Sequence, residues 1–169
     1  QKIAIANHNY RNRRKVKMRE YATQMEAARK GIITPEMKIV AKKEYRTEEE
    51  IREWVAKGQV AICANRLHTC IDPNGVGSML RTKINVNLGV SRDCKDYDVE
   101  MKKVQAAVDM GAEAIMDLSS HGNTQPFRRK LTSECTAMIG TVPVYDSVIH
   151  YQRDLATLTA KDFIDVVRL

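Results

Sequence analysis

Three residues whose side chains could contact a ligand recur at a constant spacing in this sequence. Asn87, Met116 and Tyr145 lie 29 residues apart, each at or near the end of a run with strand character. A strand, a crossover helix and their turns take roughly 30 residues, so each residue falls at the same place in its own βα unit. In a (β/α)₈ barrel that place is the catalytic face, at the carboxyl ends of the strands. The spacing therefore predicts an enzyme active site.

These three side chains offer complementary contacts. The Asn87 amide can donate and accept hydrogen bonds, Met116 can pack softly against a ring, and Tyr145 supplies an aromatic face and a hydroxyl. Each also has an ordinary structural role, as a strand-end cap, a core filler and a packed aromatic. Taken singly, each structural role is favoured, and the shared spacing is evidence for ligand binding that does not decide it alone.

The elements that position these residues follow from hydrophobic periodicity. The predicted strands are residues 81–89, 112–118 and 138–145. Residues 97–110 and 124–134 have helical spacing, and Thr159 with Asp162 predicts the start of a further helix. Right-handed crossovers place such strands side by side and parallel, with Asn85 and Asn87 facing the barrel interior. The expected fold class is α/β, with residues 78–169 forming the first βα units of a (β/α)₈ barrel, which takes about 250 residues when complete.

Residues 23–77 predict a small, mainly helical N-terminal domain with a connecting loop. Thr34-Pro35 indicates an N-cap followed by proline at the first helical position, and Thr47 with Glu50 indicates a capping box. Residues 59–64 predict a short strand against the barrel, and the glycine-containing stretch 72–77 predicts a loop.

Residues 1–22 form a basic arm. Residues 1–20 hold seven Lys or Arg against one acid, so they carry +6 of the net charge of +7. Such an arm can bind nucleic acid, but residues 1–20 hold only one Phe, Trp or Tyr, Tyr10, so a solvated tail or a subunit contact is favoured. The chain starts on Gln and contains few βα units, so we expect a fragment of a longer protein.

Further candidate contacts carry weaker signals. Ser119 and His121 follow the second predicted strand and could bind phosphate, although polar βα loops are common. His68 could face the site from the N-terminal domain or lie at the surface. Arg81 and Lys83 could attract a phosphate, or could cover the bottom of the barrel because they begin a strand.

The four cysteines lack Cys-x-x-Cys spacing. A metal site at Cys63, His68 and Cys70 is one interpretation, and ordinary reduced thiols are favoured over it. No signal peptide, lipidation motif or membrane-spanning apolar run is visible, so we expect a cytoplasmic protein without a membrane partner.

Several motifs in order resemble the phosphomethylpyrimidine synthase family, radical S-adenosylmethionine enzymes that rearrange 5-aminoimidazole ribonucleotide. They are TQMEAARKGIITPEM at 23–37, AN at 64–65 with His68, RTKINVNLG at 81–89, MDLS at 116–119 and GTVPVY at 140–145. The likeness runs from about residue 23 to the end. By this resemblance the substrate contacts of the family fall on Asn87, Met116 and Tyr145. The resemblance and the shared spacing together favour ligand binding over the structural roles of these residues.

Variant motifs distinguish two products within this resemblance. Thiamine-pathway members usually read NANIGTS and PIYQ, whereas this chain reads NVNLGVS at 85–91 and PVYD at 143–146, and CAN at 63–65 replaces PAN. These variants favour the paralogue that makes 5-hydroxybenzimidazole for the lower ligand of cobalamin. The alternative is 4-amino-5-hydroxymethyl-2-methylpyrimidine phosphate, the thiamine precursor.

The resemblance also implies cofactors and an assembly. A radical carbon–carbon lyase of this kind uses a 4Fe-4S cluster, S-adenosylmethionine and zinc, whose ligands in the family lie beyond these residues, so no metal ligand is expected here. A homodimer is implied, and these residues alone should be inactive. Two other functions stay open, a non-catalytic domain that binds nucleic acid through the arm and an unrelated phosphate-binding barrel such as an isomerase.

Overall fold

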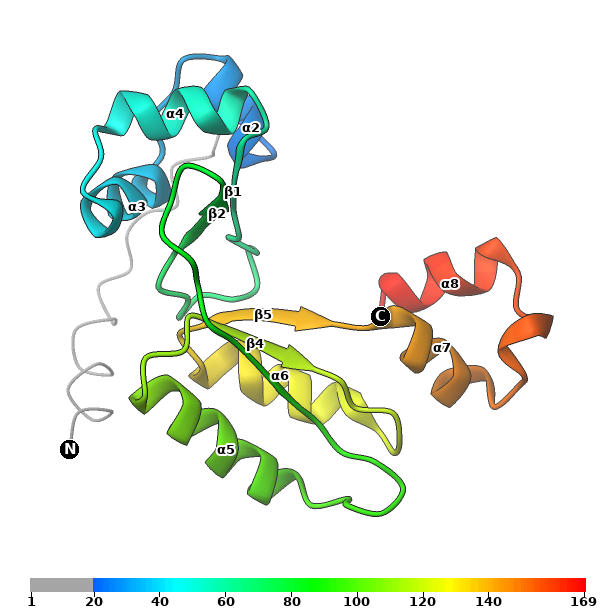
Figure 1. Cartoon of the computed structure of the whole chain (residues 1–169). Coiled ribbons are helices and arrows are strands. Elements are labelled where there is room, and N and C mark those ends of the chain that lie inside the picture. Colours follow the sequence, from blue (N-terminus) through cyan, green and yellow to red (C-terminus); the bar gives the residue numbers. More distant parts are fainter. Residues whose placement is uncertain (1–19) are drawn as a thin grey trace.

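Short helices and a two-stranded ribbon form the first hydrophobic core of the protein (Figure 1). The computed structural model describes residues 20–169, so most of the predicted basic arm lies outside the described residues. The elements of this first part are α2 (Gln24–Arg29), α3 (Pro35–Glu44), α4 (Glu48–Ala56), β1 (Val60–Ile62) and β2 (Gly75–Gly77). Met37, Val40 and Ile51 are fully buried at its centre.

Local capping signals start two of these helices as predicted. The Thr34 hydroxyl accepts a hydrogen bond from the Met37 amide at 3.1 Å, and Pro35 occupies the first helical position of α3. Thr47 and Glu50 form the predicted capping box at the start of α4. These hydrogen bonds satisfy amides that have no partner inside the helix, so the caps fix where each helix begins.

The prediction of a loop throughout residues 72–77 is wrong at its end. Gly75–Gly77 forms β2, which pairs antiparallel with β1. A Cβ atom at Gly77 would lie 2.2 Å from the Gln59 carbonyl oxygen, and one at Gly75 would lie 2.9 Å from Val40. The glycines therefore permit close packing of a strand, a use of glycine that a turn pattern does not distinguish.

A three-stranded parallel sheet forms the second part, with the order β3 (Asn85–Leu88), β4 (Ala114–Asp117), β5 (Met138–Thr141). The prediction of adjacent parallel strands is confirmed. Helices α5 (Tyr97–Asp109) and α6 (Thr124–Glu134) connect the strands and lie on the same side of the sheet (Figure 1). Parallel strands joined by helices place all three carboxyl ends at one edge.

The helices and the sheet share the second core. Ile115 and Leu131 are fully buried in it, and Phe127 is 3 % exposed, as expected for the inward anchors of α6. Asn85 and Asn87 alternate with the core residues of β3 and are exposed. They therefore lie on the sheet face that α5 and α6 leave uncovered, which is the interior face in a (β/α)₈ barrel.

The third strand ends earlier than predicted, so Tyr145 lies in a helix and not at the end of a strand. The predicted strand 138–145 stops at Thr141, and α7 (Pro143–Tyr151) begins two residues later. Pro143 has no N–H to donate to a strand, and its fixed φ suits the first helical position. Tyr145 thus lies in the first turn of a helix, and the prediction that it ends a strand is wrong.

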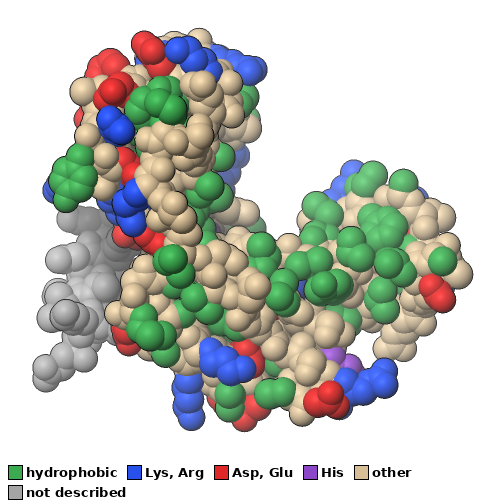
Figure 2. All heavy atoms as spheres, viewed as in Figure 1, with side chains coloured by type: hydrophobic (Ala, Val, Ile, Leu, Met, Phe, Trp, Pro, Cys, Tyr) green, Lys and Arg blue, Asp and Glu red, His purple; other side chains and the backbone are tan. Residues whose placement is uncertain are grey.

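Beyond α7, the chain continues through a short 3₁₀ helix η1 (Leu155–Thr157) into α8 (Ala160–Val167). The predicted capping box of Thr159 and Asp162 starts α8. α7 and α8 extend past the carboxyl end of β5 (Figure 1). Figure 2 shows the molecule hollowed between this pair and the N-terminal helices.

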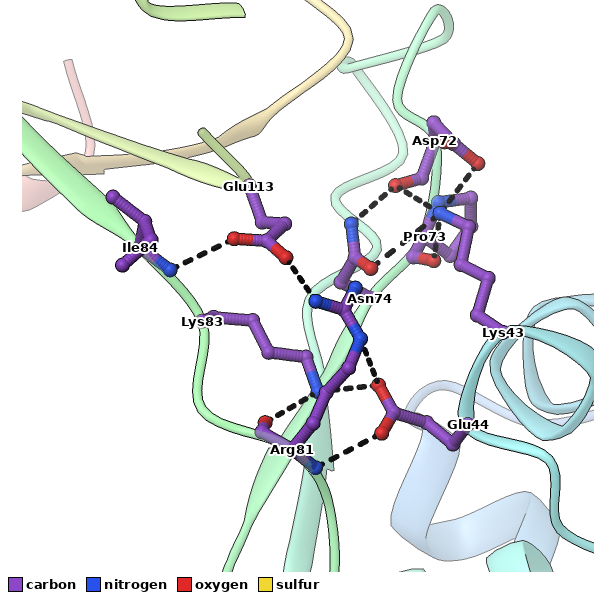
Figure 3. Close-up of polar contacts among 9 residues, drawn as sticks. All are labelled: Lys43, Glu44, Asp72, Pro73, Asn74, Arg81, Lys83, Ile84 and Glu113. Carbon is purple, nitrogen blue, oxygen red and sulfur yellow. Dashed lines mark hydrogen bonds and ion pairs between the residues drawn. The ribbon is translucent and has the colours of Figure 1, made fainter. Parts of the chain in front are cut away.

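Charged side chains join the two cores at the amino end of the sheet (Figure 3). The Glu44 carboxylate, 2 % exposed, pairs with Lys83 and accepts from the Arg81 amide at 3.0 Å. The Glu113 carboxylate accepts from Arg81 Nη1 at 2.5 Å and from the Ile84 amide at 2.7 Å. Arg81 and Lys83 thus cover the amino end of the strands, which is the second of the roles considered for them.

Candidate functional site

Two of the predicted ligand contacts are neighbours on the uncovered sheet face. Asn87 of β3 is the register partner of Met116 of β4. Asn85 Nδ2 donates to Asn87 Oδ1 at 2.9 Å, which orients the Asn87 amide. Within residues 20–169, the side-chain nitrogen Nδ2 of Asn87 has no hydrogen-bond partner, so it can donate to a ligand.

A glycine on β5 makes room for Met116. Met116 pairs with Gly140, and a Cβ atom at Gly140 would lie 2.8 Å from both Sδ and Cε of Met116. The methionine side chain therefore lies over the β5 backbone. This placement leaves its flexible thioether on the uncovered face, beside Asn87, where it can pack against a planar ligand.

The carboxyl ends of β3 and β4 are held very close together. Gly89 has φ +137°, and a Cβ atom there would lie 2.5 Å from the Ser119 amide nitrogen. The Ser119 hydroxyl accepts from the Val90 amide at 3.0 Å and donates to Asp117 Oδ1 at 2.5 Å. Ser119 is 1 % exposed, so its hydroxyl already has partners on both sides in this structure.

A half-buried arginine connects the end of β4 to the start of α7. Arg128 of α6 donates through Nε to Asp117 Oδ2 at 2.8 Å and through Nη1 to Asp146 Oδ2 at 2.6 Å. Thr124 donates to the other oxygen of Asp146 at 3.2 Å. Asp117 and Asp146 are 0 % and 9 % exposed, so both carboxylates depend on these donors in place of water.

The charge of this arginine is strongly favoured. Burial on its own would lower the pKa of Arg128, but its hydrogen bonds to Asp146 and Asp117 raise that pKa above the ordinary value. One cation thus serves two carboxylates. Arg128 Nη2 is buried and has no partner among the described residues, so the guanidinium keeps one unused donor group.

A cavity of about 740 Å³ lies beside this arginine at the carboxyl edge of the sheet. His121 lines it from the loop after β4, with Arg92, Asn123 and Arg128, while His150 lines it from α7. The residues that line it do not include Asn87, Met116 or Tyr145. The structure therefore brings Asn87 and Met116 together and places His121 in a separate recess lined by polar and apolar side chains.

His68 lies at the other end of the sheet. It is 4 % exposed, and its Nε2 lies 2.6 Å from the carbonyl oxygen of Cys135, directly after α6 and before β5. Cys70 Sγ donates to the same carbonyl at 3.1 Å. In this position His68 satisfies a carbonyl at a helix C-terminus. The surface location considered for it is wrong, because the side chain is buried, and its role toward substrate stays a prediction.

The cysteines do not fit a three-cysteine cluster site. Cys63 and Cys94 are exposed, whereas burial raises the pKa of the Cys70 and Cys135 thiols, opposite to what a thiolate ligand needs. Within residues 20–169, no three His, Cys, Asp or Glu side chains are arranged to hold a metal ion.

Sequence reasoning missed Arg128, Asp117 and Asp146. A signal was present, because Asp117 and Asp146 directly follow Met116 and Tyr145 and share their spacing of 29 residues. Gly140 gave no such signal, since its use depends on the side chain that lies over it.

Within residues 20–169, no helix is long and apolar enough to cross a bilayer.

Comparisons with known proteins agree with the motifs. The sequence profile of the Radical SAM ThiC family matches residues 23–169. A protein named phosphomethylpyrimidine synthase from Alkaliphilus oremlandii is 60 % identical over 149 residues, covering 88 % of this chain and 34 % of the relative. Proteins of the same name from Clostridium botulinum and Clostridioides difficile are each 55 % identical, over 146 and 148 residues, covering 86 % and 88 % of this chain and 33 % and 34 % of their own lengths.

The chain thus spans about a third of the length of the curated relatives that it matches. The profile match covers everything except the first 22 residues, so the resemblance found in the motifs is confirmed. A 4Fe-4S cluster and S-adenosylmethionine are implied by the family, whereas zinc is not supported by these comparisons. This chain belongs to the Radical SAM ThiC family.

Proposed function

We propose that this chain is part of a radical S-adenosylmethionine enzyme that converts 5-aminoimidazole ribonucleotide to 4-amino-5-hydroxymethyl-2-methylpyrimidine phosphate. The observation that carries the proposal is the 60 % identity to a protein named phosphomethylpyrimidine synthase. The preference for the benzimidazole product, drawn from three short motif variants, is less well supported than this alternative. The variants involve few positions, whereas the identity extends over 149 residues.

In this proposal the described residues bind and orient the substrate. The free donor of Asn87 and the thioether of Met116 lie side by side on the uncovered sheet face. A heterocycle with polar edges fits such a pair, because the amide bonds an edge while the thioether packs on the ring face. Tyr145, in the first turn of α7, is the third proposed contact. His121 and Ser119 take lower rank as contacts.

The second candidate is the synthesis of 5-hydroxybenzimidazole from the same substrate. The variant strings NVNLGVS at 85–91 and PVYD at 143–146 favour it. Val86 lies on the helix-facing side of β3, in the second core. A substitution at this position changes packing behind the sheet and leaves the Asn87 amide in place, so it is weak support for a different product.

Product analysis tests the proposal. The complete protein with a reduced cluster should be incubated anaerobically with S-adenosylmethionine and 5-aminoimidazole ribonucleotide, and the products identified by mass. We expect the pyrimidine phosphate. Formation of 5-hydroxybenzimidazole would select the second candidate, and failure to consume the substrate under conditions where a relative turns over would refute both.

The oligomeric state of the complete protein and the role of the basic arm are also proposals. A homodimer in the cytoplasm, without zinc bound by these residues, is what we expect of the complete protein, and light scattering tests the dimer. Binding of nucleic acid through the basic arm would instead appear as affinity that falls steeply with salt and disappears when residues 1–20 are removed.

A further inference from the structure

We propose that Arg128 and Asp146 act as positioning residues that hold Tyr145 at the carboxyl edge of the sheet. The inference rests on the proposed function, in which Tyr145 contacts the substrate. Asp146 is the next residue after Tyr145, and its carboxylate accepts from Arg128 Nη1 at 2.6 Å. Arg128 is in turn fixed to the sheet by its bond to Asp117 at 2.8 Å.

The start of α7 needs such a contact because it lacks the usual one. The N-cap residues of α6 and α8 are Asn123 and Thr159, and their side chains accept hydrogen bonds from backbone amides of the first turn. The N-cap residue of α7 is Val142, which makes no side-chain hydrogen bond. The direction in which α7 leaves β5 is therefore not fixed by a cap, and polar contacts from neighbouring elements decide it.

Those contacts come from one face of α6. Thr124 and Arg128 are four residues apart, so they are adjacent on the helix surface, and each bonds one oxygen of Asp146. Both oxygens of the carboxylate are engaged, and Asp146 is 9 % exposed. A buried carboxylate with two donors tolerates little rotation, which limits the movement of the adjacent Tyr145.

The two contacts of Arg128, with Asp117 and with Asp146, should have unequal effects on substrate binding. Asp117 belongs to the central strand, where backbone bonds to β3 and β5 already hold Met116 in register. Tyr145 has no such ladder, because it lies beyond the end of β5. Loss of the Arg128–Asp146 contact should therefore impair what Tyr145 does and leave Met116 as it is.

Asp146→Ala is the cleanest variant, because it leaves the Arg128–Asp117 pair intact. Asp109→Ala, at the exposed C-terminal end of α5, is the matched control for loss of one carboxylate. Affinity for 5-aminoimidazole ribonucleotide is measured by calorimetry on the complete protein, without turnover. We expect Asp146→Ala to weaken binding by roughly 5- to 100-fold, Asp146→Asn to be intermediate, and Asp109→Ala to bind like the parent.

A double-mutant cycle separates positioning from general structural damage. If Asp146 acts through Tyr145, adding Asp146→Ala to Tyr145→Phe should weaken binding by no more than about twofold further, and adding it to Met116→Leu should multiply the two losses. Losses that multiply with Tyr145→Phe would overturn the proposal. Asp146→Asn retains the shape of the side chain and carries the same cycle where the alanine variant does not fold.

Hydrogen exchange tests the same contact without substrate. The amides of α7 should exchange faster in Asp146→Ala than in the parent or in Asp109→Ala, and the amides of α5 should exchange in Asp146→Ala as they do in the parent. Equal α7 exchange in the two variants would overturn the proposal. If the parent protein does not bind the ribonucleotide, the proposed function fails, and faster exchange in α7 still supports the positioning of this helix by Asp146.

Discussion

The two ends of the parallel sheet use buried charge differently. At the amino end, Glu44 and Glu113 are matched by Arg81 and Lys83, and the contacts join the two hydrophobic cores (Figure 3). At the carboxyl end, one guanidinium serves two carboxylates, and Arg128 Nη2 has no partner within residues 20–169. The buried carboxylates of the amino end are thus matched by two cations, whereas the carboxyl end has a single cation for two carboxylates and leaves one donor group of that cation unused.

The largest expected effect is on stability, at the amino end. Glu44→Ala leaves the buried ammonium of Lys83 without its carboxylate partner, which should lower the free energy of unfolding by about 3–5 kcal/mol. Urea unfolding followed by the fluorescence of Trp54, the single tryptophan, measures it. Lys38→Ala breaks an exposed pair with Glu48 and should cost less than about 1 kcal/mol.

A double variant separates the loss of the Glu44–Lys83 attraction from the cost of leaving the Lys83 ammonium buried and unpaired. Replacing Glu44 by Leu and Lys83 by Met together removes both charges, and such replacements of buried pairs are often neutral or stabilising. We expect most of the lost stability to return. If the double variant is as unstable as Glu44→Ala, packing around Glu44 and not its charge is what matters at this end of the sheet.

The next effect is on binding, at the carboxyl end. In the complete protein, Asn87→Ala and Tyr145→Phe each remove a group proposed to bond the ribonucleotide, which should cost about 1–3 kcal/mol, or roughly 5- to 150-fold in affinity. Asn87 is exposed, so its loss should change stability little. Parental affinity by calorimetry for both folded variants would make these residues structural and remove the contrast between the two ends.

A smaller effect concerns the place of Met116. Gly140→Ala puts a methyl group 2.8 Å from the flexible end of Met116, so the thioether should move while the strand stays in place. We expect affinity to fall by less than about 1.5 kcal/mol, the limit also expected for Met116→Leu. The two changes should be non-additive. Additive losses would mean that Gly140 acts on the substrate by another route.

A feature of the fold or of the candidate site could be predicted from the sequence when the residues that determine it are close together in the chain. The caps at Thr34, Thr47 and Thr159 are set by residues within one turn, and the structure has all three. The βα alternation gave the parallel order of the strands, since periodicity reports which face is buried.

The failures come from long-range packing. Gly75–Gly77 was expected to be loop because glycine is common in turns, yet its backbone approaches Gln59 and Val60 too closely for a side chain. At 138–145, apolar character suggested a longer strand, although Pro143 already indicated a helix start. Arg128 was not recognised because its partners lie 11 and 18 residues away on other elements.

The smallest expected effect is a change in acid sensitivity at the amino end. Burial alone would raise the pKa of Glu113, but hydrogen bonds from the Ile84 amide and Arg81 bring it below the ordinary value of 4.5. Ionised Glu113 therefore stabilises the fold above pH 4.5, and this contribution disappears as pH falls through the lowered pKa. Glu113→Gln should be less stable than the parent near neutral pH and closer to it well below pH 4.5. Urea midpoints across that range measure the difference, with the exposed Glu134→Gln as control. A gap that stays constant with pH would show that Glu113 contributes through hydrogen bonding alone, without its charge.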